Sequence, residues 1–313
     1  MSAFVLRRLL LVVPTVFMIS VLTFVLSNLT PGDPAFAVAS RRHGRPASHA
    51  EVVAVRHELG LDRAALPRYL HWAGGALRGD LGKSYSTQAP VRQELFRRVP
   101  HTLQLALPAM LLAMLLAIPA GVLAAMRRNR PVDQVMRVLS MAGACMPSFW
   151  LALLLIILFS VRLHLLPVAG RGGLDHLVLP VVTLAMAPAA ILTRFTRSAM
   201  LEALGSSYVL TARAKGLNER RVVAKHALRN AVVPVVTSIG VNFGILLAGA
   251  TVIETIFVWP GVGSLLVGAI QQRDYPTIEA FVLYAGVLFA LLNLIVDVSY
   301  AFIDPRITAG SSV

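Results

Sequence analysis

The chain contains 313 residues, of which 57% are hydrophobic and only 14% charged, and its formal net charge is +14. Soluble domains carry about a quarter charged residues, so this composition indicates a membrane protein and not a larger soluble core. The basic residues lie between apolar runs without an aromatic stripe, which excludes a nucleic-acid-binding protein, and the one cysteine, Cys145, excludes a disulfide framework.

Six apolar stretches are long enough to cross a bilayer as helices, because about 20 apolar residues span its hydrocarbon core. The first, Leu9–Leu29, is longer than the apolar core of a signal peptide and lacks a small-residue cleavage site. The other five are His101–Met126, Arg137–Val161, Leu177–Thr193, Val232–Phe257 and Ile278–Ile303. We therefore predict an all-α integral membrane protein with six transmembrane helices.

The segment after the first span contains signals for short helices. Ser48 and Glu51 form a capping-box pattern before an apolar series that ends at Gly60. Pro67 is suited to the first position of a second helix. We expect these helices to lie on the outer surface of the membrane or against the spans.

Within that segment, residues 75–84 read GALRGDLGKS and end like a phosphate-binding loop. The full pattern requires a glycine five residues before Gly82, where Leu77 stands. It also requires a preceding buried strand, whereas an amphipathic helix is predicted there. We interpret the stretch as a turn and not as a nucleotide site.

Basic residues in the short loops predict the orientation of the spans. The loop 194–230 contains eight arginines and lysines and the turn 127–137 contains four, whereas 162–176 contains two and 258–277 contains one. Both termini and the two basic loops are therefore expected in the cytoplasm. The segment 30–98 has eleven basic residues and yet lies outside, so the totals on the two sides are nearly equal. It is longer than the loops of up to about 60 residues over which the rule is counted, and its acidic residues dilute the charge.

The sequence has no constellation typical of an enzyme or of an ion-driven carrier. There is no GxSxG elbow and no clustered histidine set, so we predict no catalytic residue and no metal site. Glu254, Glu279 and Asp297 stand toward span ends and form no relay of buried acids. Self-powered transport is therefore not expected, while passive conduction stays open.

The fifth span carries small residues at a spacing that favours close helix contacts. Gly240 and Gly244 form a GxxxG pattern, Gly249 follows, and the polar Asn242 lies between them. Packing within the chain is one interpretation. Contact with another subunit, or lining of a pathway, is the other.

The basic loop between the fourth and fifth spans predicts a short cytoplasmic helix at a bend. Residues 211–215 include good helix formers, Gly216 is suited to a left-handed helix end, and Asn218 is suited to cap the next helix. On composition alone, an ordinary basic loop is the favoured interpretation.

The run TARAKGLNERRVVAKHALRNAVVP in this loop resembles the coupling segment of permease subunits in binding-protein-dependent ABC importers. More narrowly, it is similar to the B-type permease of the dipeptide, oligopeptide and nickel branch. Further matches are LTPGDPA (29–35), LGLD (59–62), GDLGKS (79–84), MPSFWLALLLI (146–156), WPGVG (259–263), RDYP (273–276) and LIVDVSYAFIDPRI (294–307).

The wider family's loop has the pattern E-A-A-x3-G-x9-I-x-L-P, and this chain follows it in part. Gly216, Ala212 and Leu228 fit the glycine, the second alanine and the leucine. Leu210, Thr211 and Arg229 stand in place of the acid, the first alanine and the proline. The partial match still implies that this loop docks on a partner subunit, but it does not define the individual contacts.

The resemblance implies a fold of the type I ABC importer permease kind and a short helix around Val209–Leu217 that docks on a cytoplasmic ATPase. The residues implied in coupling are Thr211, Ala212, Arg213, Ala214, Lys215, Gly216 and Leu217. ATP and magnesium would be bound by two partner ATPase subunits, and this chain would hold no cofactor. A paralogous six-span permease, an extracytoplasmic solute-binding protein and membrane lipid are the further partners implied, in a bacterial inner membrane.

The expected division of the chain follows from these assignments. Residues 1–29 form a tail and the first span, 30–98 an extracytoplasmic segment, and 99–303 a five-helix core with the coupling loop 194–231. Residues 304–313 form a cytoplasmic tail. The implied cargo is di- or oligopeptides, with nickel, another metal chelate or glutathione as alternatives. A stand-alone channel or carrier is the alternative from a different class.

Overall fold

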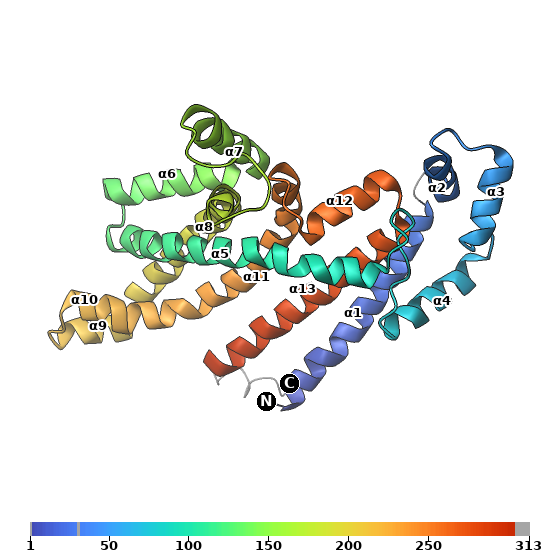
Figure 1. The fold of residues 1–313 in the computed structure, drawn as a ribbon. Coiled ribbons are helices and arrows are strands. Elements are labelled where there is room, and N and C mark those ends of the chain that lie inside the picture. Colours follow the sequence, from blue (N-terminus) through green and yellow to red (C-terminus); the bar gives the residue numbers. More distant parts are fainter. Residues whose placement is uncertain (1, 30–31, 304–313) are drawn as a thin grey trace. The chain divides into compact units, whose positions relative to one another are not determined.

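The computed structural model describes residues 2–29 and 32–303, and within them it contains helices, turns and one isolated β-bridge between Lys83 and Pro90 (Figure 1). The all-α prediction is confirmed for these residues. The predicted cytoplasmic tail at 304–313 lies outside them, as do residues 30–31 of the LTPGDPA motif.

The helices follow one another along the chain with short connections. They are α1 (Ser2–Leu29), α2 (Pro34–His43), α3 (His49–Glu58), α4 (Ala65–Leu77), α5 (Val91–Met126), α6 (Pro131–Cys145), α7 (Ser148–Leu155), the π-helix η1 (Ile156–Arg162), α8 (Asp175–Leu204), α9 (Ser207–Ala214), α10 (Glu219–Arg221), the π-helix η2 (Val222–Ala227), α11 (Leu228–Ile256), α12 (Val262–Gln272) and α13 (Tyr275–Ile303).

The chain forms two compact units, each built from segments that are distant in sequence. Unit 1 comprises Thr102–Trp259 together with short segments from both ends of the chain. Unit 2 comprises Leu6–His101 and Pro260–Leu291. The expected domains divide the chain in sequence order, whereas these units group residues by contact.

Several helices are long and apolar enough to cross a membrane. In the described residues these are α5, α8, the Pro234–Ile256 part of α11 and the Tyr275–Val296 part of α13. The pair formed by α6 and α7–η1 would be a fifth span if both helices are counted together. In α1 the apolar stretch Val12–Ser27 is shorter than these. Several apolar helices are thus confirmed, and the count of six stays a prediction.

The single span expected over Arg137–Val161 is replaced by two helices whose axes differ by 101°. Helix α6 ends at Cys145 and α7 begins at Ser148. Between them Met146 is extended, with ψ 119°, because a following proline disfavours the helical conformation of the residue before it. Pro147 also lacks the N–H that would continue the helix. The chain therefore turns at Pro147.

The core of unit 1 is built from small residues at helix contacts. Four fully buried alanines of α5 belong to this core: Ala106, Ala109, Ala113 and Ala117. On the same helix, a Cβ at Gly121 would lie only 2.6 Å from the Cβ of Thr196 on α8. Glycine therefore permits the close approach of α5 and α8, as is common between membrane helices.

Large apolar side chains on α5 are exposed, including Leu107, Leu111 and Leu115. Exposed apolar surface of this extent is unfavourable in water but suits contact with lipid tails. The distribution agrees with the prediction of an integral membrane protein.

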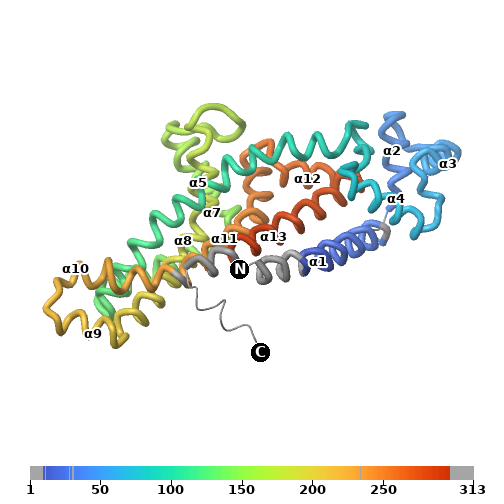
Figure 2. The backbone as a smooth tube through the Cα atoms, turned by 90° about the horizontal axis from the view of Figure 1, so that it is seen from below, coloured from blue at the N-terminus to red at the C-terminus, as the bar shows by residue number. Residues whose placement is uncertain are grey.

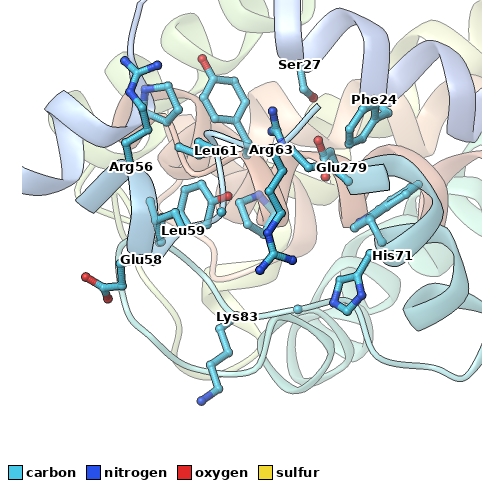
Figure 3. A pocket seen from close by; sticks show the side chains of 18 of the residues that line it. Phe24, Ser27, Arg56, Glu58, Leu59, Leu61, Arg63, His71, Lys83 and Glu279 are labelled. Atoms are coloured by element: carbon cyan, nitrogen blue, oxygen red, sulfur yellow. The ribbon is translucent and has the colours of Figure 1, made fainter. Parts of the chain in front are cut away.

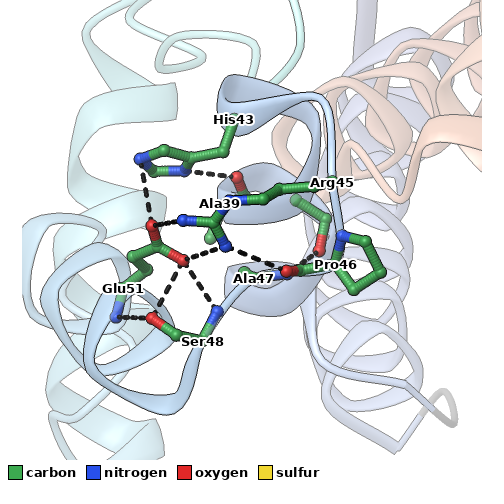
Figure 4. A network of polar contacts seen from close by, with 8 residues as sticks. Ala39, His43, Arg45, Pro46, Ala47, Ser48 and Glu51 are labelled. Carbon is green, nitrogen blue, oxygen red and sulfur yellow. Dashed lines mark hydrogen bonds and ion pairs between the residues drawn. The ribbon is translucent and has the colours of Figure 1, made fainter.

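In unit 2, α3 begins with the capping box predicted from the sequence (Figure 4). The backbone N–H of Ser48 donates to Glu51 Oε2 at 2.7 Å, and the Glu51 N–H donates to Ser48 Oγ at 3.4 Å. Arg45 and His43 approach the same carboxylate at 2.6 and 3.4 Å. The hydrogen bonds from Ser48, with a smaller contribution from Arg45, lower the pKa of Glu51 to about 2.

The next helix starts earlier than its sequence indicated. Helix α4 begins at Ala65, so Pro67 occupies the third helical position and not the first. The N–H groups of the first turn have no partner within a helix, and proline is therefore tolerated there without losing a hydrogen bond.

Candidate functional site

The predicted coupling loop forms a compact element that we call the α9–α10 turn, defined as residues 206–221. Figures 1 and 2 show α9 and α10 where α8 ends and where the chain turns back toward α11. Helix α9 spans Ser207–Ala214, so it begins and ends slightly before the expected Val209–Leu217. Two residues, Gly205 and Ser206, separate it from the end of α8.

Gly216 ends α9 in the left-handed conformation that its sequence position indicated, with φ +73°. The Gly216 N–H donates to the carbonyl of Arg213 at 2.9 Å, and the Leu217 N–H donates to the carbonyl of Ala212 at 3.4 Å. These two hydrogen bonds form a Schellman motif, which satisfies carbonyls that the helix end would leave free. A side chain at Gly216 would meet nothing within 4 Å, so the requirement for glycine comes from the backbone angle.

The segment after Gly216 reverses the chain through a second cap and an ion pair. Asn218 Oδ1 accepts a hydrogen bond from the Arg220 N–H at 3.0 Å, which confirms Asn218 as the cap of α10. The Arg213 guanidinium contacts the Glu219 carboxylate at 2.7 and 3.1 Å. Hydrogen bonding to Arg213 lowers the pKa of Glu219, although both side chains are largely exposed.

Helix α9 presents two different faces. Val209 and Ala212 are buried in an apolar cluster with residues of α5, α8 and η2, including Ala125, Met200 and Val222. Tyr208 and Leu210 lie outside this buried face, about 200° apart around the helix, and are 41% and 58% exposed. The inward face anchors the helix, and the outward face leaves two large apolar side chains without cover.

The residues predicted to couple to an ATPase are therefore divided between these faces. Ala212 is buried and Leu217 is half-buried against the same cluster. The other five are exposed: Thr211, Arg213, Ala214, Lys215 and Gly216. Tyr208 and Leu210 were not among the predicted residues. The sequence feature that could have identified them is their large apolar side chains, which stand in a short basic loop between two spans.

A π-helical turn, η2, connects this element to α11. It spans Val222–Ala227, and Val222, Val223 and Ala227 are buried in the cluster that holds α9. π-Helical turns are rare and occur frequently at functional sites. Here the π-turn lies directly between the reversal at Gly216 and a long apolar helix.

The small-residue stretch of α11 separates into packing and non-packing positions. A Cβ at Gly240 would lie 2.0 Å from Val296 Cγ2 of α13, so this glycine allows close contact within unit 1. Asn242 is buried and donates from Nδ2 to the carbonyl of Ser238, one turn earlier, at 2.7 Å. Gly244 is half-buried, and a side chain at Gly249 would meet nothing within 4 Å. The geometry gives Gly240 a packing role and leaves space beside Gly249.

Two buried carboxylates in unit 1 are held by specific partners. Asp133 on α6 is fully buried and contacts Arg197 on α8 through two hydrogen bonds of 2.6 and 2.8 Å. Glu254, near the end of α11, is also fully buried and accepts a hydrogen bond from Thr102 Oγ1 on α5 at 2.6 Å. Buried carboxylates are costly without partners, so these contacts fix α6 on α8 and α11 on α5.

In unit 2 the GDLGKS loop is held by a buried carboxylate of the RDYP motif. Asp274 accepts hydrogen bonds from Ser84 Oγ at 2.5 Å, from the Tyr85 N–H at 2.8 Å and from Thr277 Oγ1 at 2.9 Å. The Gly82 N–H donates to Asp80 at 3.0 Å. The Ser84 hydroxyl and the Gly82 N–H, which a phosphate-binding loop would present to a nucleotide, are thus engaged within the protein.

Comparison with known proteins gives two family matches that together cover most of the chain. Residues 117–309 match the family described as binding-protein-dependent transport system inner membrane component, and residues 1–106 match the N-terminal family of such components. The chain is 42% identical to the dipeptide transport system permease protein DppB of Escherichia coli, over 98% of this chain and 99% of that protein. It is 43% identical to the glutathione transport system permease protein GsiC of Escherichia coli, with the same shares covered.

Two solved structures share the fold. A chain of the MetNI methionine ABC transporter in inward-facing conformations matches with a TM-score of 0.59 and 18% identity, over 67% of this chain and 96% of that one. A chain of an amino acid ABC transporter with histidines matches with a TM-score of 0.54 and 14% identity, over 66% and 93%. At such identities the likeness concerns the fold alone.

Proposed function

Because the chain belongs to the family of inner-membrane components of binding-protein-dependent transport systems, we propose that it forms half of the translocation pathway of an ABC importer for di- or oligopeptides. Similarity to the dipeptide permease along nearly the whole chain supports this substrate class. The energy for transport comes from partner subunits, which bind ATP and magnesium.

The observation that carries the coupling role is the two-faced helix α9. Its inward face is anchored by Val209 and Ala212, and the rest of its surface exposes Leu210 and, on the other flank, Tyr208. Because α9 is packed tightly against α8 and η2, it cannot move independently of them. A movement of a docked ATPase would therefore be transmitted through α9 to α8 and α11. We assign ATPase docking to the outward face, with Thr211, Ala214 and Lys215 beside the two apolar side chains. Arg213 and Gly216 maintain the shape of the turn.

The complete transporter contains a second, paralogous permease, two cytoplasmic ATPases and a solute-binding protein on the outer side. Both termini and the α9–α10 turn face the cytoplasm, and the segment 30–98 faces outward. A cysteine at Lys83 should therefore react with an impermeant reagent added outside intact cells, whereas a cysteine at Lys215 should react only after the membrane is opened. The reverse pattern would invert the orientation.

Uptake by reconstituted proteoliposomes tests the function itself. We expect peptide accumulation only when both permeases, the ATPases, the binding protein and ATP are present. Accumulation by this chain alone would show a stand-alone channel or carrier and would refute the proposal.

Crosslinking tests the docking face. A cysteine in place of Leu210 should crosslink to the ATPase, whereas one in place of the buried Ala212 should not. Equal capture at both positions would contradict the assignment of an outward face.

Glutathione is the second candidate substrate, because the chain is equally similar to a glutathione permease. The ligand that co-purifies with the partner binding protein distinguishes the two, since a mixed set of short peptides and a single tripeptide thiol have different masses. Nickel or a metal chelate as cargo is recognised by the same measurement.

A further inference from the structure

Unit 2 contains a cavity of about 910 Å³ whose wall has both polar and apolar surface (Figure 3). Its wall is formed by the end of α1, the α3–α4 connection, α4, the loop 81–88 and the first turn of α13. Phe24, Trp72 and Tyr85 supply aromatic surface within this wall. The cavity is thus built from elements that four separate stretches of sequence bring together.

The acidic side chains in the wall already have partners. Asp33 pairs with Arg56 at 2.7 Å, and Glu58 pairs with Arg42 at 2.6 Å. Glu279 on α13 is hydrogen-bonded to Ser27. The cavity therefore offers few free acceptors for a bound cation.

Three basic side chains in the wall have no ion pair with any described residue: Arg63, Arg68 and Lys83. Figure 3 shows the Arg63 side chain extending into the space between Leu61 and Lys83. The Arg68 guanidinium lies 5.7 Å from the ring centroid of Phe24. The wall thus carries two guanidinium groups and a lysine without ion pairs, while its acids Asp33 and Glu58 are already paired. Arg68 also acts on the Glu279 carboxylate, so the remaining positive charge of the wall comes chiefly from Arg63 and Lys83.

Two further donors in the wall are buried without an acceptor. Trp72 Nε1 and Tyr275 Oη make no hydrogen bond within the described residues, and Tyr275 is only 9% exposed. An indole N–H can only donate, and a buried polar atom without a partner is rare in folded proteins. Both atoms belong to side chains that line this cavity, where a bound ligand or an ordered water can supply the missing acceptor.

From this excess of donors and positive charge we propose that the cavity binds an oxyanion, the phosphate or carboxylate of a small molecule that also has apolar surface. Guanidinium groups bind such groups through paired hydrogen bonds, and the aromatic wall accommodates the apolar part. The group could come from a phospholipid headgroup or from a free acidic solute. The proposal is independent of peptide transport, because it concerns unit 2 and a site outside the α9–α10 turn.

Binding to the purified full-length chain tests the proposal with two probes. Native mass spectrometry in detergent measures retention of phosphatidylglycerol against phosphatidylcholine, and calorimetry measures binding of free phenyl phosphate, which is not a peptide. We expect saturable binding of one probe at one site. Retention of phosphatidylglycerol identifies a lipid source, and phenyl phosphate binding identifies a soluble one.

Variants place the binding in the cavity. We expect Arg63→Ala with Arg68→Ala to weaken binding at least tenfold, since each removes a charged donor. Arg78→Ala is the matched control, because Arg78 is an exposed arginine at the end of α4 that does not line the cavity. It should change affinity less than twofold.

A milder variant covers the case in which the double variant fails to fold. Tyr275→Phe removes only the unpaired hydroxyl and should weaken binding severalfold while the thermal stability is unchanged or higher, because an unsatisfied buried group is lost. The proposal is overturned if neither probe binds, or if Tyr275→Phe and the double variant bind as tightly as the native chain. ATP-dependent uptake by the same variants reports separately on transport, so failure of one proposal is not mistaken for failure of the other.

Discussion

The α9–α10 turn and the helices α2–α4 are both made of short helices, but they are stabilised in different ways. In α2 and α3, polar contacts such as the Ser48–Glu51 capping box and the Asp33–Arg56 ion pair supplement a small apolar cluster around Val38 and Val55. In the α9–α10 turn, two buried side chains and a Schellman motif hold the helix. Both regions expose large apolar side chains, which are Tyr208 and Leu210 on α9 and Leu66, Leu70 and Leu77 on α4.

The difference lies in the contacts that hold each region. A capping box and ion pairs fix α2 and α3 through residues close to them in the fold, whereas α9 is held by an apolar cluster that it shares with α5, α8 and η2. Exposed Tyr208 and Leu210 gain nothing from the fold and become favourable only when a partner covers them. We therefore expect changes in the α9–α10 turn to affect coupling and changes in α2–α4 to affect local stability.

The largest effect is expected from Gly216→Val. A β-branched residue is strongly disfavoured at φ +73°, at a cost of about 1–2 kcal/mol, so the Schellman turn should rearrange. We expect ATP-dependent uptake to fall more than tenfold while ATPase activity loses its response to substrate. Gly205→Ala is the control, because Gly205 has φ −84° and room for a methyl group, and it should transport normally. If ATP hydrolysis in Gly216→Val is still coupled normally to uptake, the turn does not transmit movement of the ATPase to the spans.

A somewhat smaller effect is expected from removal of the outward apolar face. Tyr208→Ala combined with Leu210→Ala should lower affinity for the ATPase about tenfold, since aromatic and large apolar anchors dominate such interfaces. The fold should be preserved because both side chains are exposed. Ala212→Leu provides the contrast: it overpacks the inward cluster and should lower stability by about 1–3 kcal/mol. Pull-down of the ATPase and thermal unfolding separate the two outcomes.

In unit 2, Asp274→Asn should act locally. The amide can accept fewer hydrogen bonds than the carboxylate, so Ser84 and the Tyr85 N–H lose charged acceptors at a cost of about 1–3 kcal/mol. We expect faster proteolysis within residues 78–90 and unchanged ATPase binding. Reduced ATPase binding in this variant would show that ATPase binding does not depend on the α9–α10 turn alone.

The smallest effect concerns pH. Glu51 has a pKa of about 2 in the fold against an ordinary 4.5, so its stabilising contribution is fully present above pH 4.5 and is lost as the pH falls toward 2. Hydrogen-exchange protection in the first turn of α3 should decline across that window. In Glu51→Gln, protection should not decline across this window. If protection in the native chain is also independent of pH there, the carboxylate of the capping box does not contribute to the stability of α3.

Local signals in the sequence predicted much of this structure. Caps and turns depend on contacts between residues that are close in sequence. Their spacing alone was therefore sufficient to assign the capping box of Ser48 and Glu51, the cap at Asn218 and the turn at Gly216. The long apolar runs indicated most membrane-crossing helices for the same reason. Pro147 was also visible, yet the apolar run concealed the bend that it produces.

Features that depend on contacts between distant residues were not predictable in this way. The sequence does not indicate that Gly240 packs on Val296, that Ser84 donates to Asp274, or that Ala212 faces inward. A spacing pattern defines a helix face, but only the folded neighbours decide which face is buried. The outward positions of Tyr208 and Leu210 became clear for that reason only in three dimensions.

The π-helical turn η2 has a consequence for the evolution and engineering of this element. A π-turn accommodates one residue more than the same length of α-helix, so it is equivalent to a single-residue insertion absorbed without breaking the helix. Deleting one residue between Val222 and Ala227 would remove that insertion and restore regular winding with little net rotation of the α9–α10 turn. Deleting one residue from the regular part of α11 would instead rotate everything before it by about 100° around the helix axis. Tyr208 and Leu210 would then face another direction, although α9 itself had not been changed.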